Sequence, residues 1–231
     1  MERFFSIFDV GLIERLCDLG CLQYRQDNPF VLNSGQKTSF YFSTRVVYPD
    51  LFWLIGRCLV SLLQFKHYGA YPLAPGKTIC LVGVPEAGKP IATAMVLTNH
   101  ICGFTRLPMV DLPMRSHPKQ HGASLGRCIE IPAGWDWTQY DCWLVENVLT
   151  SGKSCVEAAH QLIRDSAAPS SLKLLALVDR DQGAPQKLAA SGMFETVLVA
   201  HSLRTVITQA ITCGRMPAEA LAAYDRELET V

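Results

Sequence analysis

The stretch Trp143-Leu-Val-Glu146-Asn147-Val-Leu-Thr150-Ser151-Gly152-Lys153-Ser154 carries the most specific pattern in this chain of 231 residues. It opens with an apolar run that is typical of a buried strand, and it ends in a glycine-containing turn before an expected helix over 155–164. A turn that enters a helix presents backbone N–H groups and the positive end of the helix dipole, which suits a phosphate group. The stretch therefore predicts a strand, an anion-binding turn and a helix.

Three further apolar segments repeat this plan. We expect strands over 79–84, 172–178 and 196–200, each followed by a helical stretch. Short, continuously apolar strands separated by helices favour an α/β fold, in which helices cover both faces of a central parallel sheet. Ligands of such sheets bind outside the carboxyl ends of the strands, so the turns at 85–89 and 150–154 should share one functional edge.

The other segments predict a small N-terminal flap, or hood, together with loops and flanking helices. In chain order we expect a helix over 6–22, strands over 30–33 and 40–43 joined at Ser34-Gly35 as a hairpin-like flap, a buried helix over 51–65, a mobile loop over 111–126 and a solvent-facing helix over 217–231. We interpret residues 1–231 as a single domain, in which about 1–48 contribute the hood and about 78–212 the core.

The composition excludes several classes of protein. Lys and Arg number 21, as do Asp and Glu, so the net charge is zero and lacks the basic excess of proteins that coat nucleic acids or acidic membranes. With 49% hydrophobic and 18% charged residues, the chain can form a core and is not disordered. Nine dispersed cysteines without a secretory signal or a metal-ligand spacing predict a protein of the reducing cytoplasm.

Two turns come close to the phosphate-binding loop of P-loop NTPases. The segments 83–89 and 148–154 almost complete the pattern G-x-x-x-x-G-K-[ST]. Pro90 replaces the magnesium-binding hydroxyl in the first, and Asn147 replaces the leading glycine in the second. We therefore disfavour an NTPase and keep only the expectation that both turns bind phosphate.

Residues 143–154 resemble the phosphoribosyl pyrophosphate (PRPP) motif of the type I phosphoribosyltransferases. That motif is an apolar strand, two acidic residues and a Thr/Ser-Gly loop; here Asn147 takes the place of the second acidic residue. The segment 115–122 is similar to the catalytic loop Arg-Lys-x-x-Lys-x-His-Gly of orotate phosphoribosyltransferases, with Ser116 in place of the first lysine. A strand-turn-helix with ordinary capping and a solvated basic loop are the structural alternatives for these two segments.

Three more segments extend this resemblance from residue 30 to residue 183. Residues 30–42 resemble the pattern F-x-L-x-S-G-x-x-S-x-Y-F of orotate phosphoribosyltransferases, although Asn33 replaces a lysine found in many members. Residues 83–89 lie where the family has its pyrophosphate-binding loop. Residues 178–183 resemble V-D-R-x-x-G, whose arginine contacts orotate in the family; a surface ion-pair cluster over 179–181 is the alternative.

The resemblance implies the type I phosphoribosyltransferase fold and a set of site residues. Contacts with PRPP are implied for Pro85, Glu86, Ala87, Gly88, Lys89, Arg115, Ser116, Lys119, His121, Glu146, Asn147, Val148, Leu149, Thr150, Ser151, Gly152, Lys153 and Ser154. Catalytic roles are implied for Arg115, Lys119, His121, Glu146 and Asn147. Contacts with orotate are implied for Asn33, Tyr41, Phe42, Thr150 and Arg180.

The activity implied is the Mg-dependent transfer of phosphoribosyl from PRPP to orotate, which gives orotidine 5′-phosphate and pyrophosphate. Magnesium is expected to be held mainly by PRPP, without a protein metal site. The family resemblance also implies a homodimer in which the loop at 115–126 reaches the neighbour's site, with PRPP and orotate as the substrates and no nucleic-acid or membrane partner.

Two alternatives stay open at this point. The replacements at Asn33, Ser116 and Asn147 also fit a catalytically weak or silent relative that senses a nucleotide or PRPP, because binding survives lost charges better than catalysis does. Lys37 and Lys89 are nearby cations that could compensate. A transferase for another base is the third possibility, and Arg180 argues against a purine.

Overall fold

The central element of the computed structural model is a five-stranded sheet in which all neighbouring strands are parallel. The structure describes residues 2–31, 37–46, 48–103, 105–122, 125–169 and 172–229. In the order β6-β5-β7-β8-β9, the strands span Met109–Asp111, Thr78–Gly83, Tyr140–Leu149, Leu172–Asp179 and Phe194–Ser202. The α/β class and the parallel sheet predicted from the sequence are therefore confirmed, and only the short strand β6 was not anticipated.

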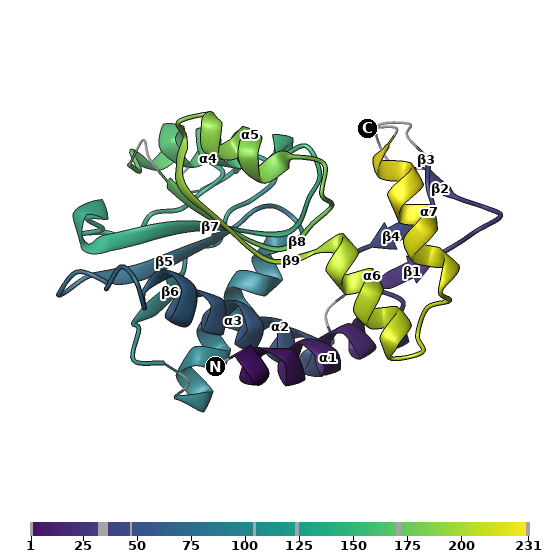
Figure 1. Cartoon of the computed structure of the whole chain (residues 1–231). Coiled ribbons are helices and arrows are strands. Elements are labelled where there is room, and N and C mark those ends of the chain that lie inside the picture. Colours follow the sequence, from purple (N-terminus) through teal and green to yellow (C-terminus); the bar gives the residue numbers. More distant parts are fainter. Residues whose placement is uncertain are drawn as a thin grey trace.

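Helices cover both faces of this sheet (Figure 1). On one face lie α1 (Glu2–Asp18), α2 (Pro49–Leu62, continued by a π-helical turn over Leu63–His67) and α3 (Gly88–Cys102). On the other lie α4 (Lys153–Ser166) and α5 (Ala184–Ala190). Each layer buries its own cluster of apolar side chains against the sheet, so the sheet is the shared wall of two hydrophobic cores. No helix in the described residues is long and apolar enough to cross a bilayer.

The N-terminal flap consists of two small antiparallel sheets. Strand β1 (Leu22–Tyr24) pairs with β4 (Phe40–Phe42), and β2 (Phe30–Val31) pairs with β3 (Lys37–Thr38). The predicted pairing of 30–33 with 40–43 is therefore wrong. Apolar packing selects the partner of β4, because the Phe40 ring is fully buried with its centroid 5.1 Å from that of Tyr24. The expected turn Ser34-Gly35 lies outside the described residues.

The two C-terminal helices end the chain, and the second of them packs beside the flap. After α6 (Leu203–Thr212), helix α7 spans Glu219–Leu228 and lies next to the flap strands (Figure 1). The predicted helix is confirmed and one side of it faces solvent, but its other side does not, since Ala220, Ala223 and Tyr224 are buried. Their i, i+3, i+4 spacing forms an apolar stripe on one side of the helix, and that stripe enters the core.

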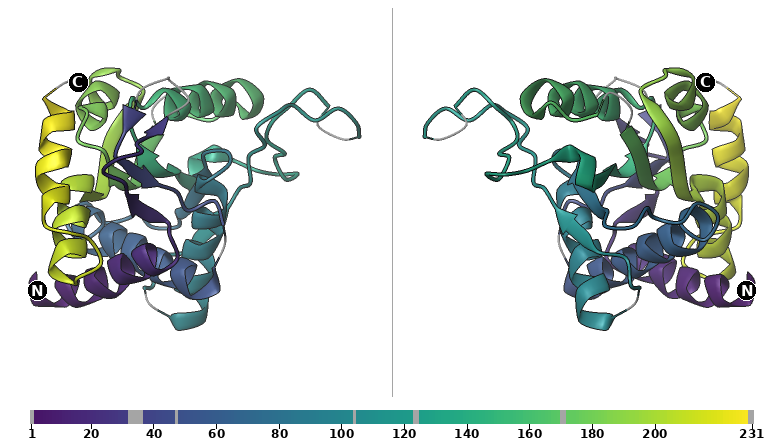
Figure 2. Two further views of the ribbon diagram at one scale, coloured as in Figure 1. Left: turned by 90° about the vertical axis from the view of Figure 1, so that its right-hand side faces the viewer. Right: turned by 90° about the vertical axis from the view of Figure 1, so that its left-hand side faces the viewer.

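The described part of the predicted loop 111–126 belongs to an extended arm, which we define as residues 112–122 and 125–130. Its two sides run antiparallel: the N–H of Arg115 donates to the carbonyl of Cys128 at 2.8 Å, and the N–H of Lys119 donates to that of Arg127 at 2.9 Å. Figure 2 shows the arm extending far from the body of the molecule. Among the described residues of the arm, only those at its base belong to the core, where Leu112, Met114, Cys128 and Ile129 are buried.

Candidate functional site

The first turn of the site follows strand β5 and requires close contact between two backbones. The N–H of Val84 donates to the carbonyl of Val145 on β7 at 2.8 Å, so the turn begins hydrogen-bonded to the neighbouring strand. A Cβ on Gly88 would lie 2.0 Å from the oxygen of that same carbonyl. Glycine is therefore required where the turn over 85–87 enters α3, at the carboxyl edge of the sheet.

The second turn follows β7 on the same edge and leads into α4. Gly152 has φ of +77°, and a Cβ there would lie 2.9 Å from the Leu188 side chain, so this position also needs glycine. Lys153 and Ser154 begin the helix and are exposed. Lys153 extends toward solvent and pairs with Glu157 at 3.8 Å. The start of α4 is thus suited to an anionic ligand, as the N-terminus of a helix is.

Glu146 and Asn147 are both buried near the end of β7. One carboxylate oxygen of Glu146 accepts from the N–H of Asn147 at 2.8 Å, and the other lies 4.0 Å from Cys155 Sγ on α4. Burial raises the pKa of Glu146 to about 7, against the opposing effects of the Asn147 hydrogen bond and of the Arg45 charge. A carboxyl that titrates near neutral pH at a sheet edge is a candidate functional group.

This raised pKa predicts that the free protein loses stability as the pH rises. The folded-state pKa lies above the ordinary value of 4.5, so the protonated carboxyl is favoured by folding. Its contribution is fully present below pH 4.5 and is lost as the pH passes about 7. From pH 5 to pH 8 we expect wild type to lose about 2–3 kcal/mol, or roughly 5–10 °C in Tm, relative to Glu146→Gln. Thermal melts of both proteins test this, and parallel pH profiles would contradict it.

Glu86 connects the first turn with the arm. Its carboxylate pairs with Lys89 Nζ at 2.7 Å and accepts a hydrogen bond from the Ser116 hydroxyl. These two contacts, with Lys89 the larger cause, lower the pKa of Glu86. The Lys89 ammonium, the cation that the first turn would offer to an anionic ligand, is therefore paired with the Glu86 carboxylate.

Glu130 likewise forms ion pairs with two cations of the arm. Lys119 Nζ lies 3.0 Å from its carboxylate, and Arg115 Nη2 lies 3.9 Å away. His121 is exposed further along the arm. A cavity of about 240 Å³ opens between the first turn, the base of the arm and α4. It is lined by Val84, Pro85, Met114, Arg115, Ser116, Cys128, Ser154, Glu157, Ala158 and Gln161, so it draws on three of the segments singled out in the sequence.

Arg180 lies at the end of β8 and is buried, with 5% of its surface exposed. Its Nη2 donates to Thr38 Oγ1 of the flap at 2.9 Å, whereas its buried Nε has no hydrogen-bond partner among the described residues. Burial lowers the pKa of this guanidinium, because removal from water disfavours its charged form. The alternative of a surface ion-pair cluster is therefore wrong. A buried, partly unpaired arginine fork is instead suited to an anionic ligand.

The structure does not place the two predicted aromatic residues together. Tyr41 is 37% exposed and its ring centroid lies 5.2 Å from that of Phe30, whereas Phe42 belongs to the core. The reason is the alternation of a strand, which turns neighbouring side chains to opposite faces. Thr150 lies at the end of β7 and is half-buried. Asn33 lies outside the described residues.

Several residues that contact this site were missed in the sequence. Glu130 pairs with Lys119 of the arm. Thr38 and Tyr224 are hydrogen-bonded to Arg180, and Glu227 accepts a hydrogen bond from Thr38. Thr38 lies within residues 30–42, the segment that resembles the family pattern, and could have been found there. Glu227 had no such signal, because its contact with Thr38 joins positions 189 residues apart.

Comparisons with known proteins point in one direction. No protein-family model matches the chain. The chain is 30% identical over 200 residues to orotate phosphoribosyltransferase of Nostoc sp., covering 85% of this chain and 87% of the relative. It is 31% identical over 163 residues to orotate phosphoribosyltransferase of Rhodopseudomonas palustris, covering 70% of this chain and 79% of the relative.

Solved structures share the fold at lower identity. UMP synthase of Leishmania donovani superimposes with a TM-score of 0.70 at 22% identity, over 96% of this chain and 42% of that longer protein. Orotate phosphoribosyltransferase of Mycobacterium tuberculosis, in complex with Fe(III) dicitrate, superimposes with a TM-score of 0.59 at 20% identity, over 86% of this chain and 98% of that one.

Proposed function

The chain belongs to the orotate phosphoribosyltransferase family, and from this premise we propose that it catalyses the reaction of PRPP with orotate. The bond between C1′ and the pyrophosphate oxygen breaks, a bond from C1′ to orotate N1 forms and N1 loses its proton, so that orotidine 5′-phosphate, pyrophosphate and a proton are released. The observation that carries the proposal is the buried Arg180, whose Nε has no partner in the described chain, on the same sheet edge as two anion-binding turns. Orotate supplies the carboxylate that this arginine lacks.

The second turn and the strand before it hold the phosphoribosyl group in this proposal. The amides of 150–154 bind the 5′-phosphate at the start of α4. The Glu146 carboxylate accepts hydrogen bonds from the ribose hydroxyls, and the Asn147 amide can accept from them or donate to them. As the bond to pyrophosphate loosens, C1′ gains positive charge, and the ionised Glu146 stabilises that charge in a buried environment.

The first turn and the arm receive the pyrophosphate. Lys89 exchanges its pairing with Glu86, and Lys119 and Arg115 exchange theirs with Glu130, for pyrophosphate oxygens. His121 adds a hydrogen-bond donor when the arm closes over the ligand. Because the chain has no net charge, the ligand's charge is met locally by these cations and by turn amides. Positioning and electrostatics suffice, and no covalent nucleophile is required.

Magnesium enters as part of the substrate complex. Among the described residues, no three His, Cys, Asp or Glu side chains gather in a way that could hold a metal ion. Mg²⁺ prefers phosphate oxygens and water to an all-protein cage, so we assign it to the oxygens of PRPP. Bound there, it would supply positive charge against the departing pyrophosphate.

A homodimer completes the proposal, with the arm of each copy reaching the site of the other. Two observations support it: the arm extends away from its own body (Figure 2), and α2 and α3 expose the large apolar side chains Trp53, Leu97 and Ile101. Sedimentation velocity at micromolar concentration tests the assembly. We also place the protein in the cytoplasm, because all nine cysteines are free thiols. We treat the chain as a single domain, because both apolar clusters share the same central sheet.

The activity is tested by mixing the purified protein with Mg²⁺, PRPP and orotate and following the loss of orotate absorbance. Turnover with release of orotidine 5′-phosphate is the expected result. The second candidate, a silent sensor of PRPP, is motivated by Asn147 and Ser116, which replace charged residues of the family pattern. It gains support if turnover is absent while PRPP still raises the Tm.

Asn147→Asp is expected to increase the rate of transfer about tenfold, because a second carboxylate stabilises the positive charge at C1′. Asn147 is buried next to Glu146, so the added charge raises the pKa of Glu146 further, and the gain should be larger at pH 8.5 than at pH 7. Steady-state kinetics at both pH values test this. An unchanged or lower rate would show that this position is not the catalytic deficit.

A further inference from the structure

The surroundings of Arg180 contain an ordered chain of side-chain hydrogen bonds that ends on helix α7. Arg180 Nη2 donates to Thr38 Oγ1 at 2.9 Å, and the N–H of Phe40 donates to the same oxygen at 3.1 Å. Two donors therefore occupy the lone pairs of this hydroxyl, and its own proton must point to an acceptor. The nearest acceptor is Glu227 Oε2 at 2.8 Å, closer than the carbonyl of Phe40 at 3.3 Å.

Glu227 uses its second oxygen on the same segment of the flap. Oε1 accepts from the N–H of Ser39 at 2.6 Å, so the carboxylate binds β3 and the residue after it with both oxygens. A carboxylate can accept from both groups at once, because it has no proton of its own. Its charge also favours the ionised form of Arg180. The carboxylate thus orients the hydroxyl that faces the arginine.

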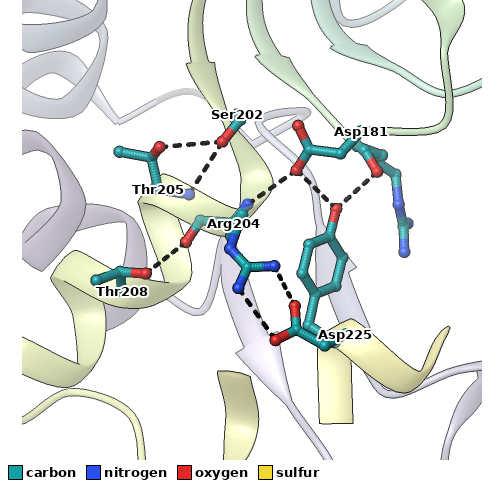
Figure 3. A network of polar contacts seen from close by, with 8 residues as sticks. Asp181, Ser202, Arg204, Thr205, Thr208 and Asp225 are labelled. Carbon is teal, nitrogen blue, oxygen red and sulfur yellow. Dashed lines mark hydrogen bonds and ion pairs between the residues drawn. The ribbon is translucent and has the colours of Figure 1, made fainter. Parts of the chain in front are cut away.

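Helix α7 is fixed to the backbone of Arg180 by separate contacts. The Tyr224 hydroxyl donates to the carbonyl of Arg180 at 2.6 Å and also lies 3.1 Å from Asp181 Oδ2. Figure 3 shows that Asp181 also accepts from the N–H of Arg204 on α6, whose guanidinium pairs with Asp225 of α7. The helix that carries Glu227 is therefore held in register with the turn that carries Arg180.

We propose that Glu227 is a positioning residue for base recognition, which orients the Thr38 hydroxyl and so holds the Arg180 fork in place for a carboxylated pyrimidine. This inference rests on the proposed function and adds α7 to the base side of the site. Glu227 acts through Thr38 and does not itself touch the substrate. Its loss should therefore weaken the use of orotate and leave the use of PRPP unchanged.

The test is the effect of Glu227→Gln on the KM of each substrate. Glutamine keeps the shape but offers one acceptor oxygen for two donors, so either Ser39 or Thr38 loses its bond. We expect the KM for orotate to rise about tenfold while the KM for PRPP stays within about twofold. Glu229→Gln, an exposed acid two residues further along the chain, is the matched control and should leave both values unchanged.

A second pair of variants tests the same contact from the flap. Thr38→Val removes the hydroxyl at constant shape and should raise the KM for orotate at least as much, whereas Thr38→Ser should recover most of the loss. Unchanged KM values for orotate, or equal increases for both substrates, would overturn the positioning role. Absence of orotate turnover in the wild type would instead refute the proposed function, so the two failures are distinguishable.

Discussion

Arg180→Met is expected to lower kcat/KM for orotate by about 10²–10³ while PRPP binding is retained. The buried Nε has no partner among the described residues, and Nη2 donates to Thr38, so in the proposed complex the guanidinium still has a donor to offer the base carboxylate. Losing a charge-assisted contact in a buried site removes about 3–4 kcal/mol of transition-state binding. Initial rates against orotate concentration, together with the Tm shift caused by PRPP, measure both parts of the expectation.

A loss of structure would not explain this result. Burial already lowers the pKa of the Arg180 guanidinium, so the free protein gains little from that charge, and the Tm of the variant should stay within about 3 °C of wild type. Arg215→Met, which removes an exposed arginine paired with Asp18 at 2.8 Å, is the matched control. Arg180→Lys should remain impaired, because lysine keeps the charge but not the planar fork. Near-normal kinetics in Arg180→Met would contradict the assignment of the base site.

The parts of the site that follow strands were predictable from the sequence. The turns 85–89 and 150–154 each come after an apolar strand, and parallel strands bring their carboxyl ends to one edge, where the structure has both turns. The arm was recognised by its residue types but interpreted as a loop. Its two sides are joined by antiparallel backbone hydrogen bonds, such as that from Arg115 to Cys128. No alternation of apolar and polar residues in the sequence predicts this pairing.

Contacts between distant segments were not predictable. Thr38 and Glu227 are 189 positions apart, and Glu86 and Ser116 are 30 apart, so neither pair has a local spacing. The separation of Tyr41 from Phe42 has a different cause, because strand alternation alone turns neighbouring side chains to opposite faces. The sequence pattern thus predicts which residues reach the edge of the sheet, while the pairing of their charges depends on tertiary packing.

Gly88→Ala is expected to cost about 3 kcal/mol or more in stability and to abolish the Tm shift caused by PRPP. The added Cβ would lie 2.0 Å from the Val145 carbonyl oxygen, a backbone atom of a central strand that cannot move aside. The turn must move instead, and it then loses the bond from Val84 to that carbonyl and misplaces Lys89. Thermal melts with and without PRPP measure both effects, with a fall in Tm of about 10 °C expected for the free protein.

Gly11→Ala is the matched control for this prediction, because it makes the same chemical change where, apart from the chain neighbours and the helix's own backbone, no described atom lies within 4 Å of the new Cβ. Gly11 lies inside α1, so alanine should stabilise the protein by about 0.5–1 kcal/mol through helix propensity and leave the PRPP response unchanged. Opposite signs for the two substitutions would show that the first turn depends on the close approach of Gly88 to β7. A Gly88→Ala protein with the Tm and PRPP response of wild type would contradict this geometry.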